Sequence, residues 1–202
     1  GIKPIIGCEV SHPSFDPEKN SDRRFFSLVL LASSNEGYRN LLKVVSDAWM
    51  ERKDEHRGHP LISWESLSEN KQGLIALSGG LGGEIAQCIL RNETGRAERI
   101  AQRLRDVFKD DFYLEAQPPV LSEMSKVQEK ILELGEALEI PVAAANDVHY
   151  LRPEDAAAHR ALLCIQMNKS VRNAGPVQVD GFHLSTPDEM REAFSKWPEA
   201  CE

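Results

Sequence analysis

The stretch PVAAANDVHYLRPED, residues 141–155, decides the fold class of this chain. Its first five residues are apolar or small, which predicts a short buried strand, and polar residues follow at once. Pro153 suits the first position of a helix, and Glu154 and Asp155 then stand at the positive end of the helix dipole. A strand, a polar loop and a helix in this order are typical of an α/β protein.

The same alternation extends through the rest of the sequence. Other strand-like apolar runs lie at residues 4–10, 25–32, 73–78 and 112–115. Apolar residues at helical spacing fill much of the sequence between them, and a capping box at residues 186–189 begins a further helix. Strands that alternate with helices predict parallel strands with the helices packed outside them, either as a barrel or as an open sheet.

The composition is that of an ordinary globular protein. Its 202 residues, 41% hydrophobic and 28% charged, suffice for one sizeable core. No apolar run approaches the roughly 18 residues that cross a bilayer, so we expect no membrane partner. The formal net charge of −8 argues against a domain that itself holds nucleic acid by the phosphates. The four cysteines are widely spaced and form no CxxC pair, which predicts reduced thiols and a cytoplasmic location.

The first residues have the character of a strand. Gly1 is followed directly by the apolar stretch IKPII, without an initiator methionine. A chain that opens inside a strand leaves an edge in need of cover, so we interpret Gly1 as a cut within a longer sequence. We accordingly expect exposed apolar surface near this end.

Three residues that end strand-like runs are good metal ligands: Glu9, Asp147 and His149. In parallel α/β folds, functional groups gather at this carboxyl edge of the sheet. The spacing of Asp147 and His149 places both side chains on one side of an extended backbone, where they could share an ion. A carboxylate with an imidazole suits zinc, manganese or iron and leaves room for a water that attacks a phosphate ester. The same spacing equally fits a hydrogen-bonded pair at a strand end.

Other chemistry-bearing residues have plainer explanations. The remaining histidines are expected to be structural; they are His12, His56, His59, His159 and His183. The glycines of residues 79–83 follow a strand and precede a helix, so they either cradle a phosphate or make a tight turn, and we expect the turn. Strand alternation points Cys8 away from Glu9 and into packing.

Several motifs together resemble a known family. In sequence order, GIKPIIGCEV, LVLLASSNEGYRNLLKVVSDA, GLIALSGGLGGEI, FYLEAQ and PVAAANDVHYLRPEDAAAHRALLCIQMNKS resemble the PHP domain of bacterial DNA polymerase III alpha subunits. FHLSTPDEM is similar to the segment that follows this domain. The resemblance implies an α/β fold, a distorted seven-stranded β/α (TIM-like) barrel of PHP type, here truncated at its N-terminal strands. It assigns residues 1–170 to the PHP domain and residues 171–202 to a segment leading toward the polymerase core.

The resemblance also implies a metal site that this chain carries only in part. The family's barrel cleft can hold three metal ions and support a 3′–5′ exonuclease, and Glu9, Asp147 and His149 match ligand positions. Ser27 stands where active members have histidine, and Gly80 stands where they have cysteine, so two ligand positions are degenerate. The family's leading H-x-H strand, an aspartate and another histidine would lie before Gly1.

The implied function is a part in DNA replication. The parent would be a DNA-directed DNA polymerase, with magnesium at a polymerase active site outside this chain, and this domain would be structural. The alternative is a retained metal-dependent exonuclease or phosphoesterase with zinc or manganese in the cleft. A free-standing phosphatase is a third reading, which GYRNL and LRPEDA disfavour. Implied partners are the polymerase's other domains, a proofreading exonuclease subunit, replisome proteins, and DNA through the parent.

Overall fold

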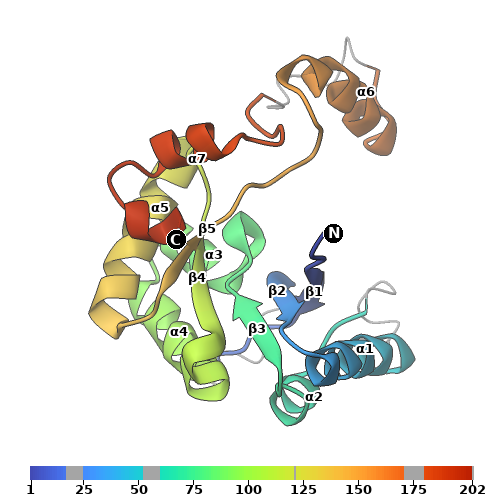
Figure 1. The fold of residues 1–202 in the computed structure, drawn as a ribbon, viewed down its shortest axis with the longest axis vertical. Coiled ribbons are helices and arrows are strands. Elements are labelled where there is room, and N and C mark those ends of the chain that lie inside the picture. Colours follow the sequence, from blue (N-terminus) through green and yellow to red (C-terminus); the bar gives the residue numbers. More distant parts are fainter. Residues whose placement is uncertain (17–24, 52–59, 121, 171–179, 202) are drawn as a thin grey trace.

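A mixed α/β fold, with a five-stranded sheet and several helices, is seen in the computed structural model of the chain (Figure 1). The structure describes residues 1–16, 25–51, 60–120, 122–170 and 180–201. Within these ranges the strands follow one another across the sheet in sequence order. They are β1 (Ile6–His12), β2 (Phe26–Ala32), β3 (Leu74–Leu77), β4 (Phe112–Ala116) and β5 (Val142–Ala144).

The prediction of parallel strands is wrong for β2. This strand pairs antiparallel with both β1 and β3, whereas the pairs β3–β4 and β4–β5 are parallel. The reason lies in how the chain returns after β2. The Ser33 amide donates a 2.9 Å hydrogen bond to the Gly73 carbonyl, so β3 starts beside the end of β2 and must run back along it. The helices between β2 and β3 therefore belong to a connection between antiparallel strands and not to a crossover between parallel ones.

The helices agree with the sequence signals at their starts. Thr186 Oγ1 accepts a hydrogen bond from the Glu189 amide, and the Glu189 carboxylate accepts one from the Thr186 amide, which confirms the capping box. Pro153 opens a 3-10 turn that continues into the last long helix. The α-helices in the described ranges are α1 (Asn35–Met50), α2 (Trp64–Glu69), α3 (Glu84–Leu90), α4 (Thr94–Phe108), α5 (Ser122–Leu138), α6 (Ala156–Gln166) and α7 (Pro187–Ala193). Of these helices, none has both the length and the apolar character needed to cross a membrane.

The core lies between one face of the sheet and the helices. Alternate residues of β2, such as Leu28 and Leu30, are fully buried and pack with apolar residues of α1, α3, α4 and α5. Their neighbours Val29 and Leu31 are only half-buried and point to the opposite face. This alternation leaves the second face of the sheet open, and the candidate site lies there.

The two ends of the chain behave differently. Ile2 and Ile5 are 96% and 75% exposed, so the expected apolar surface near Gly1 is confirmed. Phe194, after α7, is fully buried in the main core.

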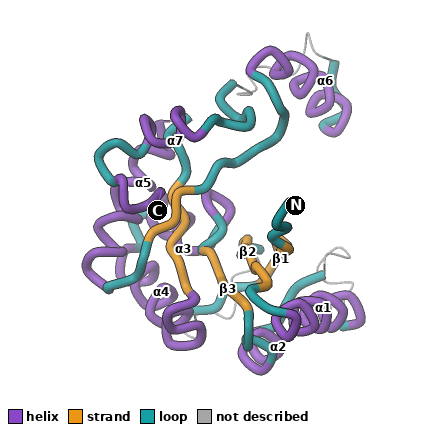
Figure 2. The backbone as a smooth tube through the Cα atoms, viewed as in Figure 1, coloured by secondary structure: helices purple, strands orange, loops and turns teal. Residues whose placement is uncertain are grey.

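Figure 2 shows α6 at the end of a long loop, away from the sheet. The domain boundary at residue 170 stays a prediction, and residues 171–179 lie outside the described part.

A buried guanidinium ties the segment after β1 to two helices. Arg96 of α4 is 4% exposed, and its nitrogens lie 2.9 Å from Glu84 Oε1 and 3.3 Å from Asp16 Oδ2. Glu84 also accepts hydrogen bonds from the Ser14 hydroxyl, at 2.5 Å, and the Phe15 amide, at 2.8 Å. Burial raises the pKa of the Glu84 carboxyl, and these hydrogen bonds and the Arg96 charge oppose that shift.

Removal of this guanidinium should destabilise the fold strongly. Arg96→Met leaves the Glu84 carboxylate buried without a cation and Asp16 with only the partly exposed Arg99, which should lower the free energy of unfolding by about 3 to 5 kcal/mol. Arg99→Met is the matched control, because Arg99 also pairs with Asp16 at 3.1 Å but its side chain is 43% exposed. The control should cost about 1 kcal/mol or less. Urea denaturation measures the free energy of unfolding of both variants. An equal loss in the two variants would contradict the structural role assigned to Arg96.

His12 is a buried, neutral histidine. It is 1% exposed, its ring stacks on Phe15 with 3.8 Å between centroids, and its Nδ1 lies 2.6 Å from the Pro13 carbonyl. Since a carbonyl only accepts, Nδ1 carries the proton. Burial lowers the pKa of His12 from 6.5 to about 4, although hydrogen bonds to the Pro13 and Ser27 backbone oppose the shift. The expectation that His12 is structural is confirmed.

The chain should therefore lose stability in mild acid through His12. The unfolded state takes up this proton near pH 6.5 and the folded state only near pH 4, so stability falls as the pH drops between these values. The loss from this residue should be about 3 kcal/mol, because one pKa unit corresponds to about 1.4 kcal/mol. His12→Asn retains a donor near Nδ1 without the titration, so its urea midpoint should fall less between pH 7.5 and pH 4. An equal decrease of the urea midpoint in the wild type and in His12→Asn would contradict this role of His12.

Candidate functional site

The candidate site lies on the open face of the sheet. The strands β1, β3, β4 and β5 run in one direction, so their carboxyl ends share one edge. Glu9 of β1 lies opposite Val29, which lies opposite Leu77 of β3, and this row crosses the open face. Glu115, the last residue but one of β4, lies on the same face, two residues beyond the partner of Leu77, and Asp147 follows β5.

These strand ends form a cleft of about 360 Å³. Three carboxylates line it, those of Glu9, Glu115 and Asp147, together with the Gln117 and Asn146 amides and apolar residues of β2 and β3. None of the described residues that line the cleft is a lysine, arginine, histidine or cysteine. The cleft thus concentrates negative charge and oxygen ligands without a cation in its walls.

Glu115 is a cleft residue that was not predicted from the sequence. It is 7% exposed; its Oε1 accepts a 2.9 Å hydrogen bond from Gln117 Nε2, whereas Oε2 has no hydrogen-bond partner among the described residues. Burial raises the pKa of Glu115, and hydrogen bonds from Gln117 and the Gly79 amide oppose the shift. The negative charges of Asp147 and Glu9 raise the pKa of Glu115 further, so the three carboxylates interact electrostatically. The sequence feature that could have identified Glu115 is the one used for Glu9, a carboxylate residue at the end of a strand-like apolar run.

Ser27 and Gly80, which the family resemblance predicts to be degenerate ligand positions, both lie against side chains of the cleft. The Ser27 hydroxyl donates a 2.6 Å hydrogen bond to Glu9 Oε1, so this serine orients a carboxylate of the cleft. Gly80 has a left-handed backbone, with φ at 52°, and a β-carbon there would overlap the side-chain amide of Gln117. A side chain at position 80 would therefore meet both backbone strain and Gln117.

Asp147 and His149 form the pair that the alternative interpretation describes. His149 Nε2 lies 3.1 Å from Asp147 Oδ1, and both side chains are partly exposed. The His149 ring lies 5.2 Å from that of His159 and 5.3 Å from that of Phe182, between centroids. The structure therefore brings Glu9 and Asp147 into one cleft, while His149 reaches only Asp147 and is not among the residues that line the cleft.

The remaining candidates have structural roles or lie outside the described residues. His183 Nε2 lies 3.5 Å from Glu189 Oε1, next to the start of α7. Cys8 packs against the core, as strand alternation predicts. Gly79, with φ at 84°, abuts the backbone of Ser27, so the glycine-rich segment is a tight turn. His56 and His59 fall in the part that is not described.

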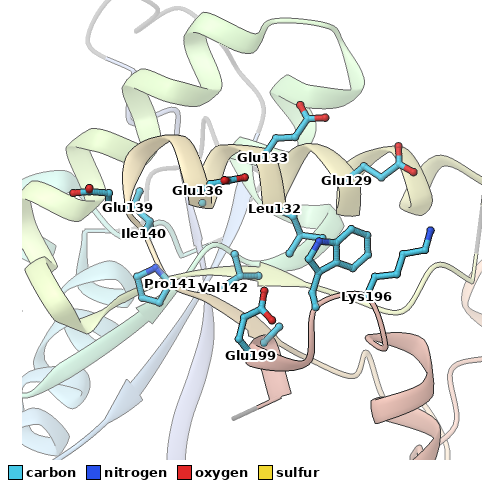
Figure 3. Close-up of a pocket in the computed structure, with 13 residues that line it drawn as sticks. Glu129, Leu132, Glu133, Glu136, Glu139, Ile140, Pro141, Val142, Lys196 and Glu199 are labelled. Carbon is cyan, nitrogen blue, oxygen red and sulfur yellow. The ribbon is translucent and has the colours of Figure 1, made fainter.

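A second concave surface is lined by α5, β5 and the C-terminal segment. We call it the acidic groove, and it has a volume of about 980 Å³ between α5 and the C-terminal segment. Figure 3 shows glutamates of α5 along it, with Lys196 and Glu199 opposite. Leu132, Val142 and Trp197 add apolar area. Its charged lining residues are Glu129, Glu133, Glu136, Glu139, Lys196 and Glu199.

No three His, Cys, Asp or Glu side chains within the described ranges stand close enough together to hold a metal ion directly. The cleft nevertheless joins residues that the family resemblance assigned, on a sheet of the expected α/β class. A family model of the PHP domain matches residues 1–119. The chain belongs to the PHP domain family.

The PHP relatives are much longer proteins. The chain is 39% identical to the DNA polymerase III subunit alpha of Thermus aquaticus over 198 residues, which cover 95% of the chain and 16% of that protein. It is 35% identical to the Treponema pallidum protein of the same name over 206 residues, 98% of the chain and 17% of the relative. The Borreliella burgdorferi protein of that name matches the whole chain at 35% identity. The chain spans about one sixth of the length of these curated relatives.

A transition-metal cluster of the PHP kind does not fit the described cleft. Zinc and iron favour imidazole and thiolate ligands, and the described lining offers only oxygen atoms. Ser27 is engaged with Glu9, and Gln117 fills the space beside Gly80. Carboxylate and amide oxygens instead suit magnesium or manganese.

Proposed function

We propose that this chain is part of the PHP domain of a bacterial replicative DNA polymerase III alpha subunit and serves there as a structural module in DNA replication. The observation that carries the proposal is the similarity to alpha subunits along 95% or more of the chain. Its five strands would belong to a distorted seven-stranded β/α barrel. The parent would carry the polymerase activity, its magnesium and its DNA contacts on other domains, in the cytoplasm.

The state of the cleft supports a structural role. The family resemblance requires ligands at positions 27 and 80, and here one position holds a serine bonded to Glu9 and the other a glycine covered by Gln117. A hydrolytic centre needs a metal-bound water aimed at a phosphate, and that needs several ligands fixed on one ion. The net charge of −8 likewise offers no attraction to a DNA strand.

A retained phosphodiesterase is the second candidate function. It is favoured by one observation: Glu9, Glu115 and Asp147 line an open cleft that a phosphate ester with its metal ions could enter. In that case Glu9, Asp147 and His149 would hold manganese or zinc, and manganese suits the oxygen atoms of the cleft better.

A nuclease assay separates the two. The complete gene product, supplied with Mn²⁺ or Zn²⁺ and a primer with a mismatched 3′ end, should release no nucleotide above the level of its Asp147→Asn variant. Purification of both proteins in parallel controls for contaminating nucleases. Metal-dependent release that Asp147→Asn abolishes, at an unchanged melting temperature, would overturn the structural role.

We also propose that the acidic groove is the docking surface for a basic segment of a protein partner, the proofreading exonuclease subunit. Five glutamates face one lysine in this groove, so a segment with Lys or Arg would find complementary charge. The aliphatic part of a Lys or Arg side chain in such a segment could also pack against Leu132 and Trp197, while its charged group stays near the glutamates.

Neutralising the groove should weaken that association. Glu129→Gln with Glu136→Gln should raise the Kd for the organism's own exonuclease subunit about tenfold at low salt, with most of the difference lost at 0.5 M salt. Glu65→Gln with Glu69→Gln removes the same charge from α2 and is the matched control. Biolayer interferometry measures both, and an equal effect of the two double variants would exclude the groove.

A further inference from the structure

We propose that a pocket between α3, α4 and α5 receives one large apolar side chain of the protein partner whose basic segment lies in the acidic groove. We call it the anchor pocket, and its volume is about 190 Å³. An acidic residue of the partner would lie beside that apolar side chain. The inference rests on the proposed docking in the acidic groove and adds a second contact, of different chemistry, to the same partner.

The spacing of residues along α5 places the groove and the anchor pocket on neighbouring flanks of this helix. The groove is lined from α5 by Glu129, Leu132, Glu136 and Glu139, at steps of three and four. The anchor pocket is lined from α5 by Lys130, Glu133, Leu134 and Ala137, and by Lys126 one turn earlier. The second row follows the first by one residue, which turns an α-helix by about 100°. Glu133 lines both surfaces, so one partner can reach both across the exposed side of α5.

The floor of the anchor pocket is apolar and belongs to the core. Ile89 of α3, Ala97 of α4 and Leu134 of α5 line it and are only 5%, 1% and 7% exposed. Asn92 lies between α3 and α4 with a left-handed backbone, φ 60°, and its Oδ1 accepts a 2.8 Å hydrogen bond from Lys126 Nζ. This bond ties the connection between the two helices to α5. Because core packing and this bond fix the walls, a side chain can enter without the cost of ordering them first.

The size of the anchor pocket indicates what it can hold. Sites for small-molecule ligands usually measure about 300 to 1,000 Å³, and the anchor pocket is smaller than that range. Its volume suits a single side chain of the size of leucine, methionine or phenylalanine. Large side chains seated in such pockets contribute much of the binding energy of protein interfaces. A polypeptide therefore fits this site better than a small molecule does.

The charges around the anchor pocket differ from those of the groove. Two lysines, Lys126 and Lys130, and two glutamates, Glu98 and Glu133, line it, so its charges balance, whereas five glutamates face one lysine in the groove. Lys130 pairs with Glu133 at 2.5 Å on the solvent-exposed side of α5. Lys126 donates to the neutral Asn92 amide and has no carboxylate partner among the described residues. A carboxylate of the partner can therefore pair with Lys126, while its basic residues favour the groove.

The width of α5 sets the spacing that the partner needs. An α-helix with its side chains is about 10 to 12 Å across, and an extended segment advances about 3.3 Å per residue. A segment that crosses α5 from the groove to the anchor pocket therefore needs about three to five residues between its basic residue and its apolar anchor. The geometry accordingly describes the partner motif as a basic residue, this short spacer, and a large apolar residue with an acidic neighbour.

Filling the anchor pocket tests the proposal. Ala137 is exposed on α5, and Ala137→Phe in the complete gene product should fill the pocket and raise the Kd for the organism's own exonuclease subunit about tenfold. The effect should be as large at 0.5 M salt as at low salt, because the lost contact is apolar. Lys126→Met should raise the Kd about threefold, and at low salt only. Biolayer interferometry measures each Kd.

Two control variants accompany the test. Ala137→Ser leaves the pocket open and should bind as the wild type does. Ala158→Phe adds the same side chain at an exposed position of α6 and should also leave the Kd unchanged. All variants should melt within about 2 °C of the wild type, which shows that they fold.

The outcomes separate this proposal from the docking in the groove. If Glu129→Gln with Glu136→Gln weakens binding but Ala137→Phe matches Ala158→Phe, the groove is supported and the anchor pocket is excluded. An Ala137→Phe effect that disappears at 0.5 M salt would also exclude an apolar anchor. If the wild type binds no exonuclease subunit, or if neither the groove variant nor the pocket variant weakens binding, both proposals are wrong.

Discussion

The buried guanidinium of Arg96 is the interaction on which the arrangement of this domain depends. It joins Glu84 at the start of α3 and Asp16 in the segment after β1, and it does so from α4. Each of these carboxylates would be costly inside the protein alone, and so would the guanidinium. Because α3 also follows the glycine turn that abuts β2, the pairing fixes that turn, the helices and β1 relative to one another. The cleft is built from the same strands and the same turn.

Side chains in the cleft hydrogen-bond to one another. The Ser27 hydroxyl bonds to Glu9, and Gln117 bonds to Glu115 while it covers Gly80. Each bond satisfies one carboxylate oxygen and leaves others available. The described lining of the cleft is therefore rich in oxygen atoms, which magnesium and manganese prefer as ligands.

The cleft and the acidic groove share no lining residue and suit different partners. The cleft is lined by strand ends and collects three carboxylates in a small volume, so it favours a compact cation. The groove is larger and includes Trp197 and Leu132 beside its glutamates, so it favours a polypeptide with basic side chains.

Local sequence determined the elements of this fold, because strand alternation, helical spacing and capping depend on residues within a few positions of one another. Residues 141–155, the capping box at Thr186 and the position of Asp147 after a strand were predictable in this way, whereas Glu9, expected at a strand end, lies in the middle of β1. Tertiary structure alone decided the reversed direction of β2, the partners of Arg96, the addition of Glu115 to the cleft and the separation of His149 from its lining. These depend on contacts between distant residues, such as Arg99 and Asp16, 83 positions apart, which only the packing of the whole core can set.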